Sequence, residues 1–363
     1  MLNRLTKVII LICGLVIFEV VILSIICFYA KVSFSASKVE SGEPVAATAS
    51  NLNVIFSPNE FPIPAKTKTI IFVGDMMFDR GVEALSAKNG ADYPLLKIKP
   101  FLLGADYVSA NLEGPIVKKP QYFGAHALTF NSGPELIPVL QAANINLVTL
   151  ANNHILNRGQ EGFKQTKEFL TANQINYSGD PFKCGTDLAL IKDNIIFLGI
   201  NKTFPTDCQD KEISQTIQTL KQESPDNFII VSIHWGVEYQ TKNSASQKKL
   251  AHLLVDNGAD LILGSHPHVV QNIEEYNGKL IFYSLGNFVF DQYFSQKTQQ
   301  SLAVKLELGS DKEIYGIFPL QSRLSQPQLM VNKERIEFLK QLAANSSTEL
   351  QAAIKDGQIE IKF

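Results

Sequence analysis

Cysteine is scarce in this chain: the 363 residues include only 4. So few cysteines exclude a disulfide-stabilised scaffold, and none of them forms the Cys-x-x-Cys pair that is typical of zinc ribbons and redox proteins. Cys13 and Cys27 lie in an apolar N-terminal segment. The remaining two, Cys184 and Cys208, can form a disulfide or remain free thiols, and the sequence leaves both alternatives open.

An excess of charge of either sign is also missing. The formal net charge is -2 at pH 7 and the pI is near 6.3, so no basic field favours a nucleic acid, and we expect no such partner. Internal repeats and long low-complexity tracts are absent, which excludes a solenoid. The length is sufficient for one large domain or two ordinary ones with a sizeable core.

One long apolar segment is present at residues 8–30, and Glu19 is its only charged residue. Its length matches the roughly 20 residues of a membrane-spanning helix. Arg4 and Lys7 precede it, so the positive-inside rule predicts a cytoplasmic tail at residues 1–7 and places the rest of the chain outside the cytoplasm. The apolar part of a cleaved signal peptide is usually shorter, about 7 to 15 residues. We therefore expect an uncleaved single-pass anchor in the cell membrane.

The anchor is followed by a linker at residues 31–68, which is rich in Ser, Ala, Pro, Asn and Thr and has no apolar period. Short apolar runs then recur and predict strands at residues 69–74, 106–110, 145–150, 228–233 and 261–263. Helical patterns lie between them at residues 134–143, 162–172 and 244–257. This alternation predicts an α/β layered domain. Further strands at residues 188–192, 195–200, 279–284 and 301–308 look like hairpins, so we expect mixed sheets.

Polar residues that can bind a metal ion follow five of these strands. They are Asp75, Glu113, Asn153, His234, His266 and His268. Open α/β sheets keep their sites at the carboxyl ends of the strands. Oxygen and imidazole ligands together suit Mn, Fe or Zn better than Ca or Mg. Enough ligands are present for one or two divalent ions, and two ions that share a carboxylate can support hydrolysis of a phosphate ester.

The two histidines of the last group are separated only by Pro267. Proline fixes its own φ and restrains the residue before it, so the loop can turn both imidazoles toward a common centre. A lone His-x-His pair is as compatible with a solvated loop as with metal binding, and a lone Asp after a strand usually caps a helix or a turn. Five strand ends that each carry such a group make independent coincidence a poor explanation.

Six segments occur in a fixed order: GDMMFDR, NLEGPI, LANNHILNRGQEGF, SIHWGVEYQ, LILGSHPHVVQ and YSLGNFVFDQ. Together they closely resemble the bacterial capsule-synthesis CapA family, which is linked to poly-gamma-glutamate capsule biosynthesis. That family looks like a divergent branch of the calcineurin-like metallophosphoesterases. The resemblance covers roughly residues 69–343 and implies a four-layer α/β/β/α fold.

The resemblance also implies a role for each candidate ligand. Asp75 and His268 would bind a first metal ion, and Glu113 would bridge it to a second. The second metal ion would be bound by Asn153, His234 and His266.

Four further residues take supporting roles in this scheme. His154 resembles the histidine that protonates the leaving group or stabilises the phosphorane, and we assign it as the general acid. Arg80 is a candidate clamp for an anionic substrate, because its planar fork matches carboxylate and phosphate; a surface salt bridge is the alternative. Glu238 and Asn287 are expected at the mouth of the site, beside the ligands.

Some positions depart from the phosphoesterase plan. Met77 stands where the Asp-x-His motif has its histidine, so we expect one tight and one weak metal ion. Asn157 stands where the family usually has Asp, a change that can alter hydrogen bonding around the ligands. His126 and His252 match no ligand position and are expected to be structural.

The predicted domain therefore spans residues 69–325, and a C-terminal extension at residues 326–363 carries one helix at residues 332–344 and a polar tail. Two functions remain open. One is a membrane-anchored, outward-facing metal-dependent hydrolase that acts on an anionic envelope polymer or a phosphoester. The other is an accessory subunit for polymer assembly or export with a vestigial metal site. The resemblance also implies membrane subunits of a capsule synthesis complex as partners.

Overall fold

The computed structural model describes residues 67–362. The predicted cytoplasmic tail, the predicted anchor at residues 8–30 and the linker up to residue 66 lie outside these described residues. Among the residues that are described, no helix has the length and apolar character needed to cross a membrane.

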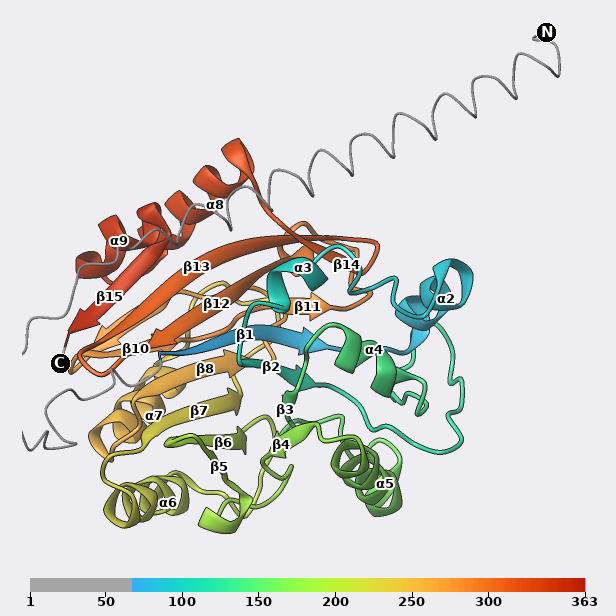
Figure 1. Ribbon diagram of the computed structural model, residues 1–363, viewed down its shortest axis with the longest axis horizontal. Coiled ribbons are helices and arrows are strands. Elements are labelled where there is room, and N and C mark those ends of the chain that lie inside the picture. Colours follow the sequence, from blue (N-terminus) through green and yellow to red (C-terminus); the bar gives the residue numbers. More distant parts are fainter. Residues whose placement is uncertain (1–66, 363) are drawn as a thin grey trace, which may run out of the picture. The chain divides into compact units, whose positions relative to one another are not determined.

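A large sheet forms the middle of the fold (Figure 1). Its strand order within residues 67–362 is β14-β13-β12-β1-β2-β3-β4, and β11 and β15 pair with β1 and β13. The strands are β1 (Lys68–Met76), β2 (Tyr107–Leu112), β3 (Leu147–Thr149), β4 (Asn176–Ser178), β11 (Asn287–Val289), β12 (Gln300–Leu308), β13 (Lys312–Arg323), β14 (Gln326–Leu329) and β15 (Gln358–Lys362). β1 to β4 are parallel neighbours, so their carboxyl ends meet at one edge.

A second sheet has the order β5-β6-β7-β8-β10-β9. Its strands are β5 (Leu190–Lys192), β6 (Ile195–Asn201), β7 (Phe228–His234), β8 (Leu261–Ser265), β9 (Ile273–Tyr276) and β10 (Lys279–Phe282). The four inner strands are parallel, whereas β5 and β9 pair antiparallel at the two edges. Both sheets are thus mixed or bear antiparallel edges, as the hairpin-like strands predicted.

Alternating side chains place each sheet between two apolar layers. In β1, Ile70 and Phe72 face the second sheet, while Ile71 and Val73 join the cluster that contains α4 and α5. Strands of the second sheet turn their other face toward α6 and α7. This period of two is the expected pattern of a strand buried on both faces. The predicted mixed α/β fold with two sheets is confirmed.

The helices are mostly outside the two sheets (Figure 1). They are α2 (Arg80–Asn89), α3 (Lys99–Leu102), α4 (Leu136–Ala142), α5 (Gly159–Ala172), α6 (Asp210–Glu223), α7 (Ala245–Asp256), α8 (Asn332–Asn345) and α9 (Gln351–Asp356), with 3-10 turns η1 (Thr186–Leu188), η2 (Lys297–Gln299) and η3 (Thr348–Leu350). α7 begins with a capping box in which the Ser244 side chain and the Gln247 side chain bond each other's backbone, as its sequence favours.

The structure corrects one expectation for the C-terminal residues and decides between the two alternatives for Cys184 and Cys208. The extension was expected to carry one helix followed by a polar tail, but the residues after α8 form a second helix, α9, and the strand β15, which pairs antiparallel with β13. Cys184 and Cys208 form a disulfide with a Cα–Cα distance of 5.4 Å, within the usual range, which settles the alternative that the sequence left open.

Candidate metal centre

The candidate ligands converge because the strands that carry them are neighbours. Asp75 is the eighth residue of β1 and pairs with Asn111 in β2 on one side and with Asn287 in β11 on the other. His234 ends β7 and pairs with Ser265, the last residue of β8. The two sheets therefore present their carboxyl ends to the same space, and the side chains there are buried.

Two glycines allow the backbones around this space to approach closely. A Cβ atom at Gly74 would lie 1.8 Å from the carbonyl oxygen of Gly286, and one at Gly264 would lie 1.9 Å from that of Tyr283. No side chain fits at such distances. These glycines thus fix where Asp75 and the histidine loop after β8 are placed.

The loop after β8 holds both histidines in an unusual backbone conformation. His266 has φ 92° and His268 has φ 58°, in the left-handed region that L-residues rarely occupy, and Pro267 lies between them. Each such residue costs on the order of 1 kcal/mol or more. The conformation turns the two imidazoles toward each other, with ring centroids 5.9 Å apart, and the backbone N–H of His266 donates to Asp75 Oδ2 at 3.2 Å.

A first group of potential ligands lies around Glu113. The ligand atoms of Asp75, Glu113 and His268 all lie within 4.8 Å of one another. Both carboxylate oxygens of Glu113 are buried without a hydrogen-bond partner, and so is Nδ1 of His266. Buried polar atoms are rarely left unpaired in native proteins. A divalent cation would satisfy these orphaned atoms, so the residues present fit the ion that the sequence predicted.

A second group lies beside the first, around His234. Its Nε2 is 2.8 Å from Asn153 Oδ1, and its Nδ1 is 2.8 Å from the hydroxyl of Ser265. The ring of His266 is 4.9 Å from that of His234, centroid to centroid. The three residues expected to bind a second metal ion are thus brought together.

The pKa values of the titratable side chains in this space are strongly shifted. Burial and the neighbouring Asp75 carboxylate raise the pKa of Glu113 to about 8. Burial alone would lower the pKa of His268, but the carboxylates of Glu113 and Asp75 raise it to about 9. Burial and His268 lower the pKa of His266 to about 4, and burial with His266 holds the pKa of His234 well below its usual range. The last two imidazoles are therefore neutral at pH 7, the form that binds metals.

The predicted general acid, His154, lies beside Glu113, with 3.7 Å between its Nε2 and Oε1. Its Nδ1 is 3.0 Å from Asn157 Oδ1, and the same oxygen accepts the backbone N–H of Phe130 at 2.7 Å. Because that N–H fixes the oxygen of the Asn157 amide, Nδ1 of His154 must be the donor. Nε2 is thus the nitrogen that faces the ligands.

Arg80 lies in the wall of the same space, and its guanidinium is already paired. It donates to Asp291 and, at 2.8 Å, to the carbonyl of Ala127, and it lies 4.6 Å above the ring of Phe130. Its side chain is only 9% exposed. The expected alternative, a salt bridge, is present, but it is buried rather than on the surface.

The two residues expected at the mouth both lie next to His268, but Asn287 is 1% exposed and therefore lies inside the site rather than at its mouth. Asn287 Oδ1 is 2.9 Å from His268 Nδ1, and its amide nitrogen donates to the carbonyl of Thr298 at 3.1 Å. Glu238 is exposed, and its carboxylate forms a group with His266 and His268 in which all ligand atoms lie within 4.8 Å of one another. Met77 instead packs into the core beside the outer helices, so it offers no ligand here.

The family model for "Bacterial capsule synthesis protein PGA_cap" matches residues 69–183 and 189–292. The chain belongs to this family. It is 30% identical over 326 residues to "Capsule biosynthesis protein CapA" of Bacillus anthracis, covering 81% of this chain and 77% of that protein. It is 31% identical over 258 residues to "PGA biosynthesis protein CapA" of Bacillus subtilis, covering 65% and 67%. The resemblance to the CapA family is thereby confirmed.

Solved structures give only a weak likeness to this PGA_cap chain. TT1561 of Thermus thermophilus aligns with a TM-score of 0.39 at 12% identity, covering 66% of this chain and 94% of that one. Purple acid phosphatase from yellow lupin aligns with a TM-score of 0.38 at 11% identity, covering 74% and 54%.

Two buried asparagine side chains that contact the candidate ligands were not predicted as site residues. The Asn111 amide nitrogen lies 2.8 Å from Asp75 Oδ1 and 3.2 Å from His234 Nδ1, and its oxygen accepts from Asn152 at 3.0 Å. Asn152 in turn accepts the backbone N–H of His154. Their only sequence signal is their position, two residues before Glu113 and directly before Asn153.

Metal binding to this PGA_cap chain is expected to weaken as the pH falls. A cation must displace the protons that Glu113 holds below about pH 8 and His268 holds below about pH 9. Below these pH values, each proton that is released on binding should lower the apparent affinity for the cation by up to about tenfold for every unit by which the pH falls. Calorimetric titration of the chelator-treated chain with Zn or Mn between about pH 6 and 9 checks this. An affinity that stays constant over this range would exclude both groups as ligands.

Proposed function

We propose that this PGA_cap-family chain is a membrane-anchored protein of capsule or poly-gamma-glutamate biosynthesis whose extracytoplasmic domain is a metal-dependent hydrolase of phosphate esters. The observation that carries the proposal is Glu113, a fully buried carboxylate with no hydrogen-bond partner, surrounded by candidate ligands from both sheets. An isolated carboxylate is costly to bury, so a site built around one favours a bound cation.

The residues divide naturally between two ions. Asp75, Glu113 and His268 would hold one, and Asn153, His234 and His266 would hold another. A divalent ion at such a site supplies positive charge that stabilises a phosphoryl group under attack and makes water a better nucleophile near neutral pH. Mn, Fe or Zn suits the mixed oxygen and nitrogen ligands.

The proton for the leaving oxygen would come from Nε2 of His154. Burial lowers the pKa of His154 to about 4 in the ligand-free chain. An anionic phosphate bound beside the ring favours the imidazolium and raises that pKa, so substrate binding favours protonation of His154. Asn157 keeps Nδ1 hydrogen-bonded and thereby leaves Nε2 free to transfer its proton to the ester oxygen as the P–O bond breaks.

The site walls support an anionic substrate. Arg80 lies close enough to influence the charge of both Glu113 and His154. The ion pair between Arg80 and Asp291 would have to open before Arg80 could bind a phosphate directly.

The membrane anchor is proposed from residues 8–30, whose length and flanking charges are those of a single membrane-spanning helix.

The test is hydrolysis by the full-length chain, purified in detergent and stripped with chelator. We expect cleavage of nitrophenyl phosphate or bis-nitrophenyl phosphate only after Mn, Fe or Zn is restored. Stoichiometric metal binding without cleavage of either ester would overturn the hydrolase assignment.

A second candidate is an accessory subunit for polymer assembly or export, with a metal site that no longer turns over. Met77 supplies no metal ligand, and the guanidinium of Arg80 is paired with Asp291. Fewer groups are therefore available to bind a metal ion and a substrate. A relative from Mycobacterium tuberculosis, 25% identical over 216 residues and covering 51% of this chain, is described as a "Probable polyglutamine synthesis accessory protein". Metal-dependent thermal protection by glutamyl oligomers, but not by phosphate, would favour this function.

A further inference from the structure

The loop after β7 carries a carboxylate that the proposed mechanism does not use. Glu238 is exposed, and its ligand atom lies within 4.8 Å of those of His266 and His268. Two ligands of one zinc ion, each about 2.1 Å from it, are separated by at most about 4.2 Å. An exposed side chain moves by this difference without strain, so Glu238 is within reach of an ion that these histidines bind.

Backbone hydrogen bonds hold the loop of Glu238 against the loop of the two histidines. On one side of Glu238, the N–H of Trp235 donates to the carbonyl of Ser265 at 3.1 Å. On the other side, the N–H of Tyr239 donates to the carbonyl of Pro267 at 2.8 Å. The backbone therefore keeps Glu238 beside the histidines, whichever rotamer its side chain adopts.

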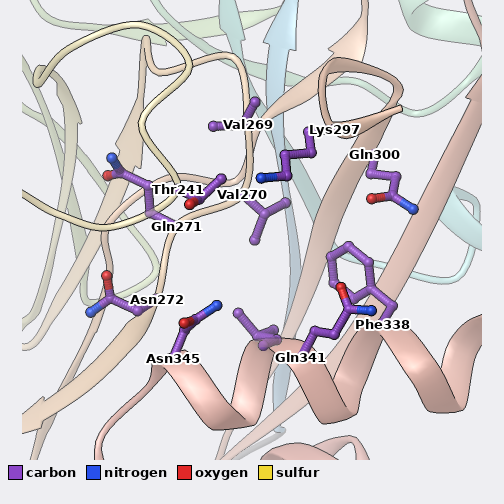
Figure 2. Close-up of a pocket in the computed structure, with 11 residues that line it drawn as sticks. Thr241, Val269, Val270, Gln271, Asn272, Lys297, Gln300, Phe338, Gln341 and Asn345 are labelled. Atoms are coloured by element: carbon purple, nitrogen blue, oxygen red, sulfur yellow. The ribbon is translucent and has the colours of Figure 1, made fainter. Parts of the chain in front are cut away.

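The part of this loop that follows Glu238 is fixed by a buried amide. Figure 2 shows Gln271 and Thr241 among the residues that line a small pocket beside α8. The amide nitrogen of Gln271 donates to the carbonyls of Gln240 and Lys242 at 2.9 and 3.1 Å, and Gln271 is 1% exposed. Little of the loop has to be ordered when an ion binds, which lowers the cost of binding.

The histidines beside Glu238 each have a ring nitrogen left for an ion. Nδ1 of His266 is buried without a hydrogen-bond partner, and His266 as a whole is only 9% exposed. Nδ1 of His268 lies 2.9 Å from Asn287 Oδ1, and the Asn287 amide nitrogen donates to the carbonyl of Thr298. Because Oδ1 of Asn287 is thereby fixed as an acceptor, Nδ1 of His268 is the donor and Nε2 remains for the ion.

The first ligand group needs one more ligand on this side. A four-coordinate ion held by Asp75, Glu113 and His268 has one position open. Glu238 shares His268 with that group and lies close enough to influence the charge of Glu113. We propose that Glu238 is a further metal ligand, which binds the same ion as His268 on the open side of the centre. This inference rests on the proposed function only in requiring a bound metal ion, and it does not require hydrolysis.

The direct test places a sulfur atom at position 238. The Glu238→Cys variant is purified as the full-length chain in detergent, stripped with chelator and loaded with Co²⁺. A thiolate is itself a metal ligand, so we expect a thiolate-to-cobalt charge-transfer band in the near-ultraviolet that the wild type lacks. The matched control is Glu223→Cys, which changes an exposed glutamate at the end of α6 and should give the spectrum of the wild type.

Metal affinity gives a second readout that needs no catalysis. In calorimetric titrations with Zn or Mn, Glu238→Gln is expected to bind one ion about tenfold or more weakly than the wild type. Groups that only orient ligands already contribute about 10- to 100-fold to metal affinity, so a direct ligand should contribute at least as much. Glu223→Gln removes the same charge from a site outside the centre and should bind as the wild type does.

The two proposals are separated by their outcomes. Absence of the charge-transfer band in cobalt-loaded Glu238→Cys would overturn the assignment of Glu238, whatever the affinity of Glu238→Gln, and would leave the proposed hydrolase intact. A band together with stoichiometric metal, but without cleavage of either nitrophenyl ester by the wild type, would support Glu238 as a ligand and overturn the hydrolase. A wild type that binds no metal ion would overturn both.

Discussion

Replacing both His266 and His268 by alanine is expected to abolish stoichiometric metal binding while the domain stays folded. His268 lies within 4.8 Å both of the ligand atoms of Asp75 and Glu113 and of those of Glu238 and His266. His266 carries a buried ring nitrogen without a hydrogen-bond partner. Loss of one ligand commonly lowers the affinity severely, and loss of two leaves mainly oxygen ligands. Elemental analysis of chain purified without chelator measures the effect directly.

The matched control for this variant is His126→Ala, which removes an exposed histidine that lies in neither ligand group. It should keep the full metal content. Alanine retains the backbone cost of the left-handed conformation, so a His268→Gly variant separates backbone strain from ligation: it should fold at least as well and still lose metal. Full metal content in the double variant would remove both histidines from the site.

Replacing His154 by alanine is expected to lower hydrolysis of esters with poor leaving groups by about 10²- to 10⁴-fold, the usual contribution of a general acid. Nitrophenyl esters should lose much less activity, because nitrophenolate leaves without a proton. Metal content should not change, since the His154 ring binds no ion in the proposed arrangement. Rates for alkyl and nitrophenyl phosphates, measured side by side, give this ratio.

His252→Ala is the matched control, since His252 stacks on Tyr276 and pairs with Glu274 away from the metal centre. It should leave both rates unchanged. An equal loss with good and poor leaving groups in the His154 variant would assign His154 to substrate positioning rather than to proton transfer.

Much of the candidate site could be predicted from the sequence because a parallel strand puts its next polar residue at a known edge. Asp75, Glu113 and His234 all come at or after the ends of apolar runs. The ligand atoms of Asp75 and Glu113 lie within 4.8 Å of each other, and Asn111 contacts both Asp75 and His234. Pro267 was expected to restrain the residue before it, but His266 has φ 92°, outside the extended region that proline favours for that residue, so its conformation could not be read from the sequence. Membership of the family followed from motifs that extend over most of the domain.

Other features depend on partners that are far apart in the sequence and could not be read locally. Asn111 contacts Asp75 and His234 through the tertiary fold alone, and Arg80 meets Asp291 across 211 positions. The strand β15 looks polar because every other residue faces solvent, and only pairing with β13 reveals it.

The position of β1 has a consequence for the order in which this domain can form. β1 is the first described strand to be synthesised, yet it lies inside the large sheet, between β2 and β12, and β12 follows it by more than 200 residues. Pairings over such separations close slowly, because the entropy of a long loop is lost before contacts are gained. Asp75 therefore meets the last of its candidate ligand partners only after residue 268 has been synthesised, so the candidate metal centre is expected to form late in the folding of the domain.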